Sequence, residues 1–293
     1  MLTETVLATA QNSLADIITS LTNAKNGTTA KGGTSQAYTE AQVMASYSLG
    51  LSLAGLETGS VAATAGGGDG SALIWDNQAL SDSISYSFTE LTSPGSDWTY
   101  EGWLISDDGS TKLSTGVMTL KSDGSISHMY TSPTGENLVH RYDQVVITVE
   151  PVPDTDPTPS GIVAGSHKIP AGAIAHIRHL LTNWPGGADK GILTNLKGQL
   201  DVAILHANLA AASTTLDKVV QHLHHVINII EGADGGNHDA SFGDPGDGIG
   251  VLAHAADRKH AGFAAGAAAD DAVVNSHAQL VDVYGKNASD WAT

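Results

Sequence analysis

Histidine is the residue type in this chain of 293 residues that most suggests chemistry. There are 13 histidines, as many as lysine and arginine together, and 11 of them lie between His167 and His277. Neutral imidazole is a good ligand for zinc, copper, nickel and haem iron, and facing helices can bring several imidazoles together. The candidates for a metal or haem site are His176, His179, His206, His222, His225 and His277.

The helical period places these histidines on particular faces. His222 and His225 are one turn apart, beside the main apolar stripe of their expected helix, and His206 flanks an apolar stripe on the preceding one. His277 falls in the middle of such a stripe, so its imidazole should point into the bundle and should need a partner there.

Three interpretations of the histidines stay open at this point. They could form hydrogen bonds between helices or to the backbone, with His224, His238 and His254 facing solvent. They could bind copper, zinc or haem b. Without cysteine the haem could not be attached covalently, and non-covalent haem would need two opposed imidazoles. They could also make a pH-sensitive interface whose packing loosens near about pH 6 when crowded imidazoles are protonated.

A glycine-rich acidic loop is a second candidate site. Carboxylate and amide oxygens are the ligands that calcium prefers, and this loop offers Asp234, Asn237, Asp239, Asp244 and Asp247. Its spacing departs from the EF-hand pattern and lacks the closing glutamate. The alternative is a solvated acidic turn that caps the next helix.

The sequence lacks the motifs of common enzymes. It has no cysteine, which excludes disulfides, thiolate metal sites and a cysteine nucleophile. A phosphate-binding loop, a Gly-x-Ser-x-Gly elbow and a His-Glu-x-x-His motif are also missing from it. We therefore predict that the protein is not an enzyme and has no catalytic residue.

Residues 1–69 are expected to form an N-terminal helical segment. Apolar residues recur at helical spacing from Leu2 to Leu21 and again from Glu40 to Leu56, and the glycines of residues 65–70 read as a linker. Two such helices bury little by themselves. Their apolar stripes must pack either on the rest of the chain or on a neighbouring copy, as an assembly arm.

Along the rest of the chain, the spacing of apolar residues changes from helical to alternating and back to helical. This pattern predicts an α+β protein of several domains. Over residues 70–168, strands such as the one through Ile84, Tyr86 and Phe88 alternate with turn signals, which is typical of an antiparallel β-sandwich. Residues 169–293 form a histidine-rich helical bundle, with helices expected at 170–183, 190–212, 215–231, 250–267 and 270–285.

The predicted sandwich carries motifs of a known family. They are Tyr-Glu-Gly-Trp-Leu-Ile at residues 100–105, Gly116, Asp123-Gly124 and Val-Ile-Thr-Val-Glu-Pro at residues 146–151. As a set they resemble the extracytoplasmic C-terminal domain of anti-sigma-K-type factors, over about residues 71–165. The resemblance implies a non-catalytic sandwich at the outer surface. The chain is expected to lack that family's cytoplasmic zinc-binding module and membrane helix, so sigma-factor regulation is not expected to carry over.

Charge and composition narrow the expected partners and compartment. The formal net charge of -18 disfavours nucleic acid and anionic lipid surfaces, and no apolar run is long enough for a membrane helix. The N-terminus has no signal-peptide pattern, so a leader is expected to be either removed or absent. Few lysines and no cysteine still favour an extracellular or cell-surface protein. We predict a self-assembling structural protein, a homo-oligomer or filament. The alternative is an extracellular redox protein that holds haem b or copper through the bundle histidines.

Overall fold

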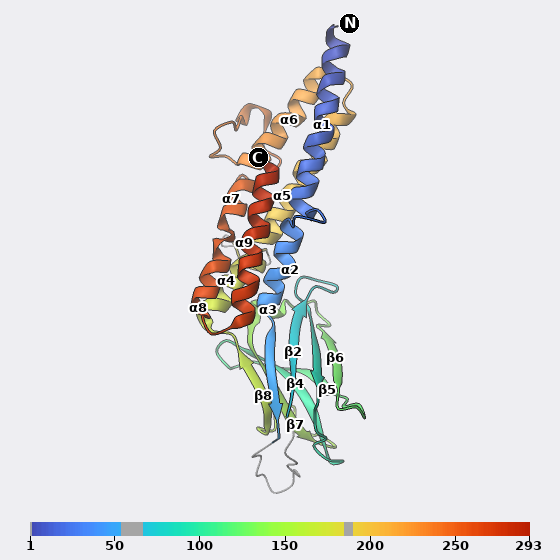
Figure 1. Cartoon of the computed structure of the whole chain (residues 1–293), viewed down its shortest axis with the longest axis vertical. Helices are drawn as coiled ribbons and strands as arrows, with labels where there is room; N and C mark the ends of the chain where they lie inside the picture. Colours follow the sequence, from blue (N-terminus) through green and yellow to red (C-terminus); the bar gives the residue numbers. More distant parts are fainter. Residues whose placement is uncertain (1, 54–66, 185–189) are drawn as a thin grey trace. The chain divides into compact units, whose positions relative to one another are not determined.

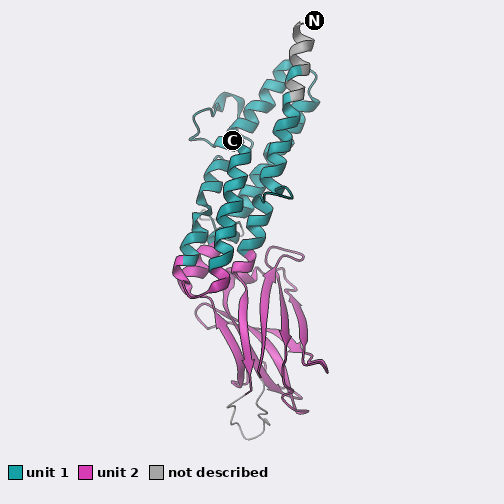
Figure 2. Cartoon of the chain, viewed as in Figure 1, with its two compact units in different colours: residues 1–41, 179–265, 275–293 teal, residues 42–178, 266–274 magenta. Residues whose placement is uncertain are grey.

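A computed structural model describes residues 2–53, 67–184 and 190–293. The chain divides into two compact units, drawn in different colours in Figure 2. The helical unit comprises residues 1–41, 179–265 and 275–293, and the sandwich unit comprises residues 42–178 and 266–274. Helices combined with two antiparallel sheets confirm the predicted α+β fold class.

The sandwich unit contains two four-stranded antiparallel sheets (Figure 1). The first has the order β1 (Tyr47–Ser52), β2 (Gly67–Trp75), β3 (Ser83–Thr89), β6 (Ile126–Thr131). The second has the order β5 (Lys112–Met118), β4 (Trp98–Ser106), β7 (Tyr142–Pro151), β8 (Val163–Lys168). The short helix α3 (Leu138–Arg141) immediately precedes β7. Alternation along the strands sends every second side chain inward, and this produces the core of the sandwich.

Aromatic side chains and their hydrogen bonds hold the sandwich core together. Tyr86 of β3 and Trp103 of β4 are almost fully buried. The indole N–H of Trp103 donates to Thr148 Oγ1 over 2.8 Å, and the hydroxyl of Tyr86 lies 2.9 Å from Thr115 Oγ1. The polar ends of both rings therefore find partners inside the core, as buried polar groups must.

The prediction of a helix from Glu40 to Leu56 is wrong. Helix α2 (Thr34–Met44) ends earlier, and β1 pairs with β2 over Tyr47–Ser52. The expected linker is also wrong where the structure describes it, because residues 67–70 begin β2. Glycine is needed there: a Cβ on Gly70 would lie 2.2 Å from the carbonyl oxygen of Ser87 on β3. These glycines allow close strand approach rather than flexibility.

The helical unit draws on most of the helices of the chain. They are α1 (Leu2–Asn26), the first part of α2, the end of α4 (Ala171–Leu181), α5 (Ile192–Ala212), α6 (Leu216–Glu231), α7 (Val251–Ala256), and most of α8 (His260–Ala267) and of α9 (Ala272–Ala292), with 3₁₀ turns η1 (Ala240–Phe242) and η2 (Asp257–Lys259). The predicted helix over 250–267 is thus divided by η2, and the last helix extends beyond 285.

Helix α5 lies at the centre of the contacts in this unit. It packs against α1, α6 and α7, and Figure 1 shows α1 alongside it. Leu14 of α1, Ala210 of α5 and Val219 of α6 form one buried cluster. The N-terminal helix therefore packs on its own chain, in agreement with the first of the two alternatives for its apolar stripe.

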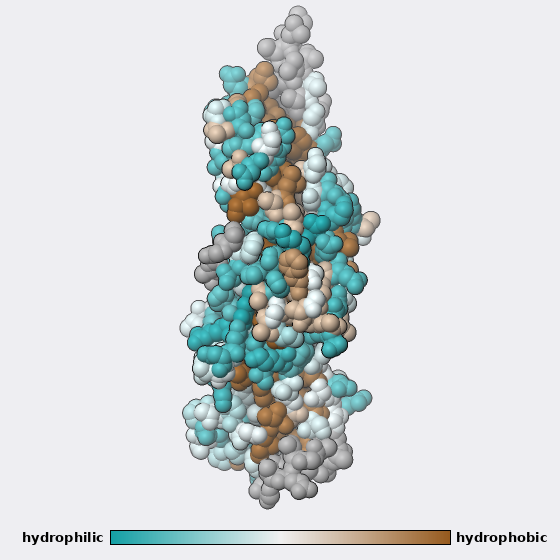
Figure 3. All heavy atoms as spheres, turned by 90° about the vertical axis from the view of Figure 1, so that its left-hand side faces the viewer, coloured by the Kyte–Doolittle hydropathy of each residue, from teal (hydrophilic) through white to brown (hydrophobic). Residues whose placement is uncertain are grey.

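The surface mixes polar and apolar residues. On the face drawn in Figure 3, hydrophobic residues are interspersed with hydrophilic ones along the helices. Exposed apolar side chains such as Leu205 and Phe263 are common on folded proteins and need no partner. Within the described ranges, no helix combines the length and apolarity needed to cross a bilayer.

A candidate metal centre in the helical unit

Helices α5 and α6 form a hairpin that positions three histidines. Residues 213–215 connect the helices, which pack against each other along their length. On α6, Val219 and Val226 are buried, whereas His222 and His225 lie on the half-buried flank of the same helix. Residues three apart on a helix are surface neighbours, so these two imidazoles lie side by side and face His206 of α5.

The three imidazoles meet through one type of ring nitrogen. The Nδ1 atom of His206 lies 3.2 Å from Nδ1 of His222 and 3.0 Å from Nδ1 of His225. Within the described part of the chain, one ligand atom from each of these residues lies within 4.8 Å of the others. We call His206, His222 and His225 the trihistidine cluster.

A backbone carbonyl fixes the proton of one of these rings. Nε2 of His225 lies 2.8 Å from the carbonyl oxygen of Phe242, which can only accept, so Nε2–H donates. In neutral His225 the Nδ1 atom therefore carries a lone pair directed at His206. A hydrogen bond from the second ring nitrogen is how ligating histidines are usually oriented.

The loop that carries this carbonyl is anchored to α6 by the fully buried side chain of Asn228. Its Nδ2 donates to the carbonyl oxygens of Asp239 (2.9 Å) and Gly243 (2.7 Å), and its Oδ1 accepts from the backbone N–H of Asp239 (2.9 Å). The ring of His224 stacks on Phe242 with centroids 3.8 Å apart. The acceptor of the His225 proton is thus held at a fixed place.

Two members of the cluster are biased toward the neutral form. Burial lowers the pKa of His206, and the neighbouring His225 and His222 lower it further. Burial also lowers the pKa of His222, with contributions from His225 and from the ammonium of Lys218 one turn away. A neutral imidazole keeps a lone pair on one ring nitrogen, so burial favours the form in which each of these two rings can accept.

Other predicted histidines form pairs with different partners. Nδ1 of His179 lies 3.2 Å from Nδ1 of His260, and the indole of Trp184 contacts both rings. His176 precedes His179 by one turn of α4 and belongs to the sandwich unit. His260 was not among the predicted candidates, because nothing in the period of its own segment shows which helix it faces.

His277 has the partner that its place on an apolar stripe requires. Its Nδ1 forms a hydrogen bond with a carboxylate oxygen of Glu40, which comes from α2. This contact joins two segments of the helical unit that are far apart in the sequence. His277 therefore pairs with a carboxylate and does not join the trihistidine cluster.

The carboxylates of the acidic loop have hydrogen-bond partners within the loop, which favours the alternative interpretation over calcium binding. Its carboxylates accept hydrogen bonds from their own loop: Asp239 from Ser241 N, Asp244 from Gly246 N and Asp247 from Ile249 N. Asn237 donates to Glu231, and Asp234 is exposed. In the described ranges these oxygens do not form a common ligand group. The loop instead makes the local turns of the alternative interpretation.

Asp247 also has a histidine partner from α7. Its Oδ2 lies 2.7 Å from Nε2 of the fully buried His254. Burial alone would raise the pKa of Asp247, but hydrogen bonds from His254 and from the backbone of Ile249 lower it overall. His254 was expected to face solvent and instead links the loop to α7.

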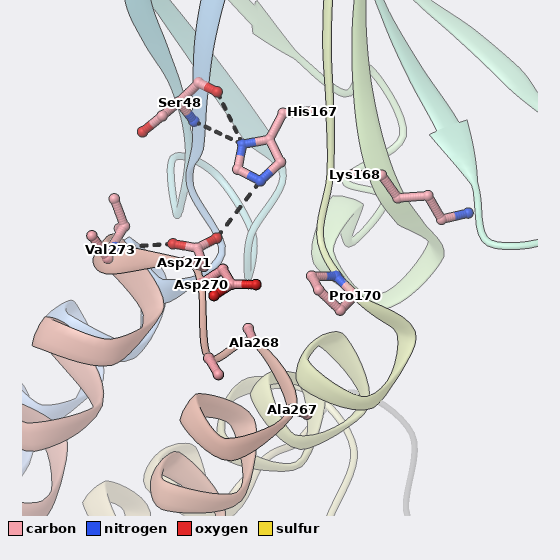
Figure 4. A pocket seen from close by; sticks show the side chains of 11 residues that line it. Ser48, His167, Lys168, Pro170, Ala267, Ala268, Asp270, Asp271 and Val273 are labelled. Carbon is pink, nitrogen blue, oxygen red and sulfur yellow. Dashed lines mark hydrogen bonds and ion pairs between the residues drawn. The ribbon is translucent and has the colours of Figure 1, made fainter.

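A pocket of about 450 Å³ in the sandwich unit is lined by His167, which is not among the predicted site residues (Figure 4). The backbone N–H of Ser48 on β1 lies 3.0 Å from Nδ1 of His167 on β8, and Nε2 of His167 lies 3.6 Å from Oδ2 of Asp271. The same Nδ1 atom also lies 3.0 Å from the carbonyl oxygen of Ser48. His167 thus connects a strand pair to the segment before α9.

The fold and the cluster define an α+β protein in which a two-sheet sandwich is joined to a helical unit carrying a histidine site. Residues 5–163 match the family model described as "Anti-sigma-K factor rskA, C-terminal". The match covers more than half of the chain, which therefore belongs to this family. It confirms the resemblance inferred from the strand motifs and extends it through α1 and α2. No curated protein and no solved structure matches the chain.

Membership of an anti-sigma factor family overturns the predicted function. The prediction of a self-assembling structural protein that forms a homo-oligomer or filament is wrong, and so is the alternative of a redox protein with haem b or copper. The helix that motivated self-assembly packs on α5 and α6. In the trihistidine cluster the nitrogens contact each other directly, which leaves no room for a haem plane between them.

Proposed function

We propose that this chain is a non-enzymatic regulatory domain of an anti-sigma-K-type protein, and that it works outside the cytoplasm or at the cell surface. The observation that carries the proposal is the family match over residues 5–163. The corresponding partner in regulation is a sigma factor. The domain would influence that partner indirectly, through its fold rather than through a reaction.

The polar groups of the sandwich core support a structural rather than a catalytic use. The indole of Trp103 and the hydroxyl of Tyr86 bond to threonine hydroxyls in the same core. The buried carboxylate of Glu150 accepts from Thr148 and from the backbone N–H of Ser160. Each of these groups serves the fold, as expected of a domain that receives or transmits a signal.

The test compares transcription in strains of the native host that carry variants of the gene. Gly102→Val places a side chain into the core, because a Cβ there already lies 2.4 Å from Met118 Cε and 2.5 Å from Thr115 Oγ1. Val117→Thr is the matched control, since Val117 is exposed on the adjacent strand β5. A strain lacking the gene completes the set, and immunoblots report the amount of each variant.

We expect Gly102→Val and the deletion to change one sigma-dependent set of transcripts in the same direction, while Val117→Thr leaves it at the wild-type level. RNA sequencing measures this set, and co-purification of the sigma factor with core RNA polymerase checks its cause. Identical transcription in the wild-type and deletion strains, under conditions in which the protein is made, would contradict the proposal.

A further inference from the structure

The trihistidine cluster contains more lone pairs than protons at its centre. Nδ1 of His225 carries a lone pair because its Nε2–H donates to the Phe242 carbonyl. Nδ1 of His206 contacts the Nδ1 atoms of both other rings, and two N–H groups cannot point at each other. With neutral imidazoles, at most one of the three Nδ1 atoms is protonated. At least two lone pairs therefore face the same point.

We propose that His206, His222 and His225 bind a divalent transition metal ion, with zinc the ion expected first. Zinc binds histidine nitrogen at about 2.0–2.1 Å in tetrahedral geometry, which places its ligands about 3.3 Å apart. The observed contacts of 3.2 and 3.0 Å between Nδ1 atoms are close to that separation. A small outward movement of the rings would admit the ion.

The surroundings of the cluster suit a cation held by neutral ligands. The Phe242 carbonyl orients the ring of His225, as outer partners of metal ligands do. The chain as a whole has a formal charge of -18, which favours cations near its surface.

A bound ion would link α5 to α6 and, through the Phe242 carbonyl, to the loop around η1. Binding to the folded state alone would stabilise the helical unit by mass action. All three ligands lie beyond residue 163, where the family match ends. The inference therefore stands independently of the proposed regulatory function.

The experiment uses the full chain without a polyhistidine tag, freed of metal by dialysis against a chelator. Zinc chloride is titrated by calorimetry, and bound zinc is counted by elemental analysis after gel filtration. The test variant is His206→Ala, which removes the nitrogen common to both contacts. One control is His140→Ala on α3, whose residue is exposed, and the other is His179→Ala, which disrupts the other histidine pair.

We expect His206→Ala to lose one zinc equivalent or to weaken its Kd by more than about 100-fold, beyond what loss of an outer partner costs. His140→Ala should bind zinc like the wild type, and His179→Ala should retain the equivalent that His206→Ala loses. Equal zinc binding by wild type and folded His206→Ala would overturn the proposal.

A measurement on the wild type covers the case in which His206→Ala does not fold. In imidazole nitrogen NMR spectra, one equivalent of zinc should shift the Nδ1 resonances of His206, His222 and His225 and leave that of His140 unchanged. Zinc that shifts other histidines, or none, would overturn the assignment.

Discussion

The side chain of Asn228 anchors the loop around Phe242, so a substitution at this residue tests how that loop is held. Replacing it with alanine removes three hydrogen bonds of 2.7–2.9 Å from a side chain that is fully buried. Each such bond contributes about 1 kcal/mol net, so we expect Asn228→Ala to lower the free energy of unfolding by about 3 kcal/mol. For a unit of this size that corresponds to a fall in Tm of about 6–12 °C.

The assay is urea unfolding followed by far-ultraviolet circular dichroism, which reports mainly on the helices. The matched control is Asn208→Ala, because Asn208 is exposed on α5 and donates only to Ile204 within the same helix. It should stay within about 0.5 kcal/mol of the wild type. An Asn228→Ala variant that is as stable as Asn208→Ala would refute the anchoring role of this side chain.

The same variant separates anchoring from metal binding. If the Phe242 carbonyl orients His225, loosening the loop should weaken zinc binding by about 10–100-fold although no ligand is removed. Lost stability with unchanged zinc affinity would contradict this orienting role and leave the anchoring of the loop intact.

Three further predictions concern the core and the pH response. Gly70→Ala should destabilise the sandwich unit by about 1–3 kcal/mol, because the new methyl group would lie 2.2 Å from the backbone carbonyl oxygen of Ser87. Urea unfolding measures this change, and an unchanged free energy of unfolding would contradict the close approach. Thr148→Val should lower the free energy of unfolding by about 1–3 kcal/mol, because it leaves the buried Trp103 N–H without its acceptor. An unchanged near-ultraviolet spectrum and an unchanged Tm would contradict this prediction. In the metal-free protein, His206 and His222 have a lower pKa in the folded state than in the unfolded state. Their contribution to the free energy of unfolding is therefore complete above about pH 6.5 and is lost as the pH falls below that value. Acidification should thus lower Tm in the wild type more than in the His206→Ala/His222→Ala double variant, and parallel curves would refute this.

The periodicity of the sequence located most elements, because long amphipathic helices and alternating strands leave a strong local signal. It failed at Tyr47–Ser52, where Tyr47 and Leu51 fit a helical spacing while Tyr47, Leu49 and Leu51 fit a strand. Pairing with β2 makes this segment a strand. The sequence does not indicate β2 as a partner strand, because its glycines resemble those of a linker.

The candidate site was predictable in its members but not in its arrangement. The helix faces predict His206, His222 and His225 as members, yet the period of one helix does not fix its rotation against another. The carbonyl of Phe242 could not be foreseen, since a loop contact to a ring nitrogen has no sequence pattern. Glu40 as the partner of His277 lies 237 residues away in the chain, beyond the reach of local reasoning.

The most direct test of the trihistidine cluster is a crystal of the zinc-treated protein, measured with anomalous diffraction on both sides of the zinc absorption edge. We predict one anomalous peak about 2.0–2.1 Å from the Nδ1 atoms of His206, His222 and His225. Fully occupied zinc elsewhere, with the three rings still in direct contact, would contradict it.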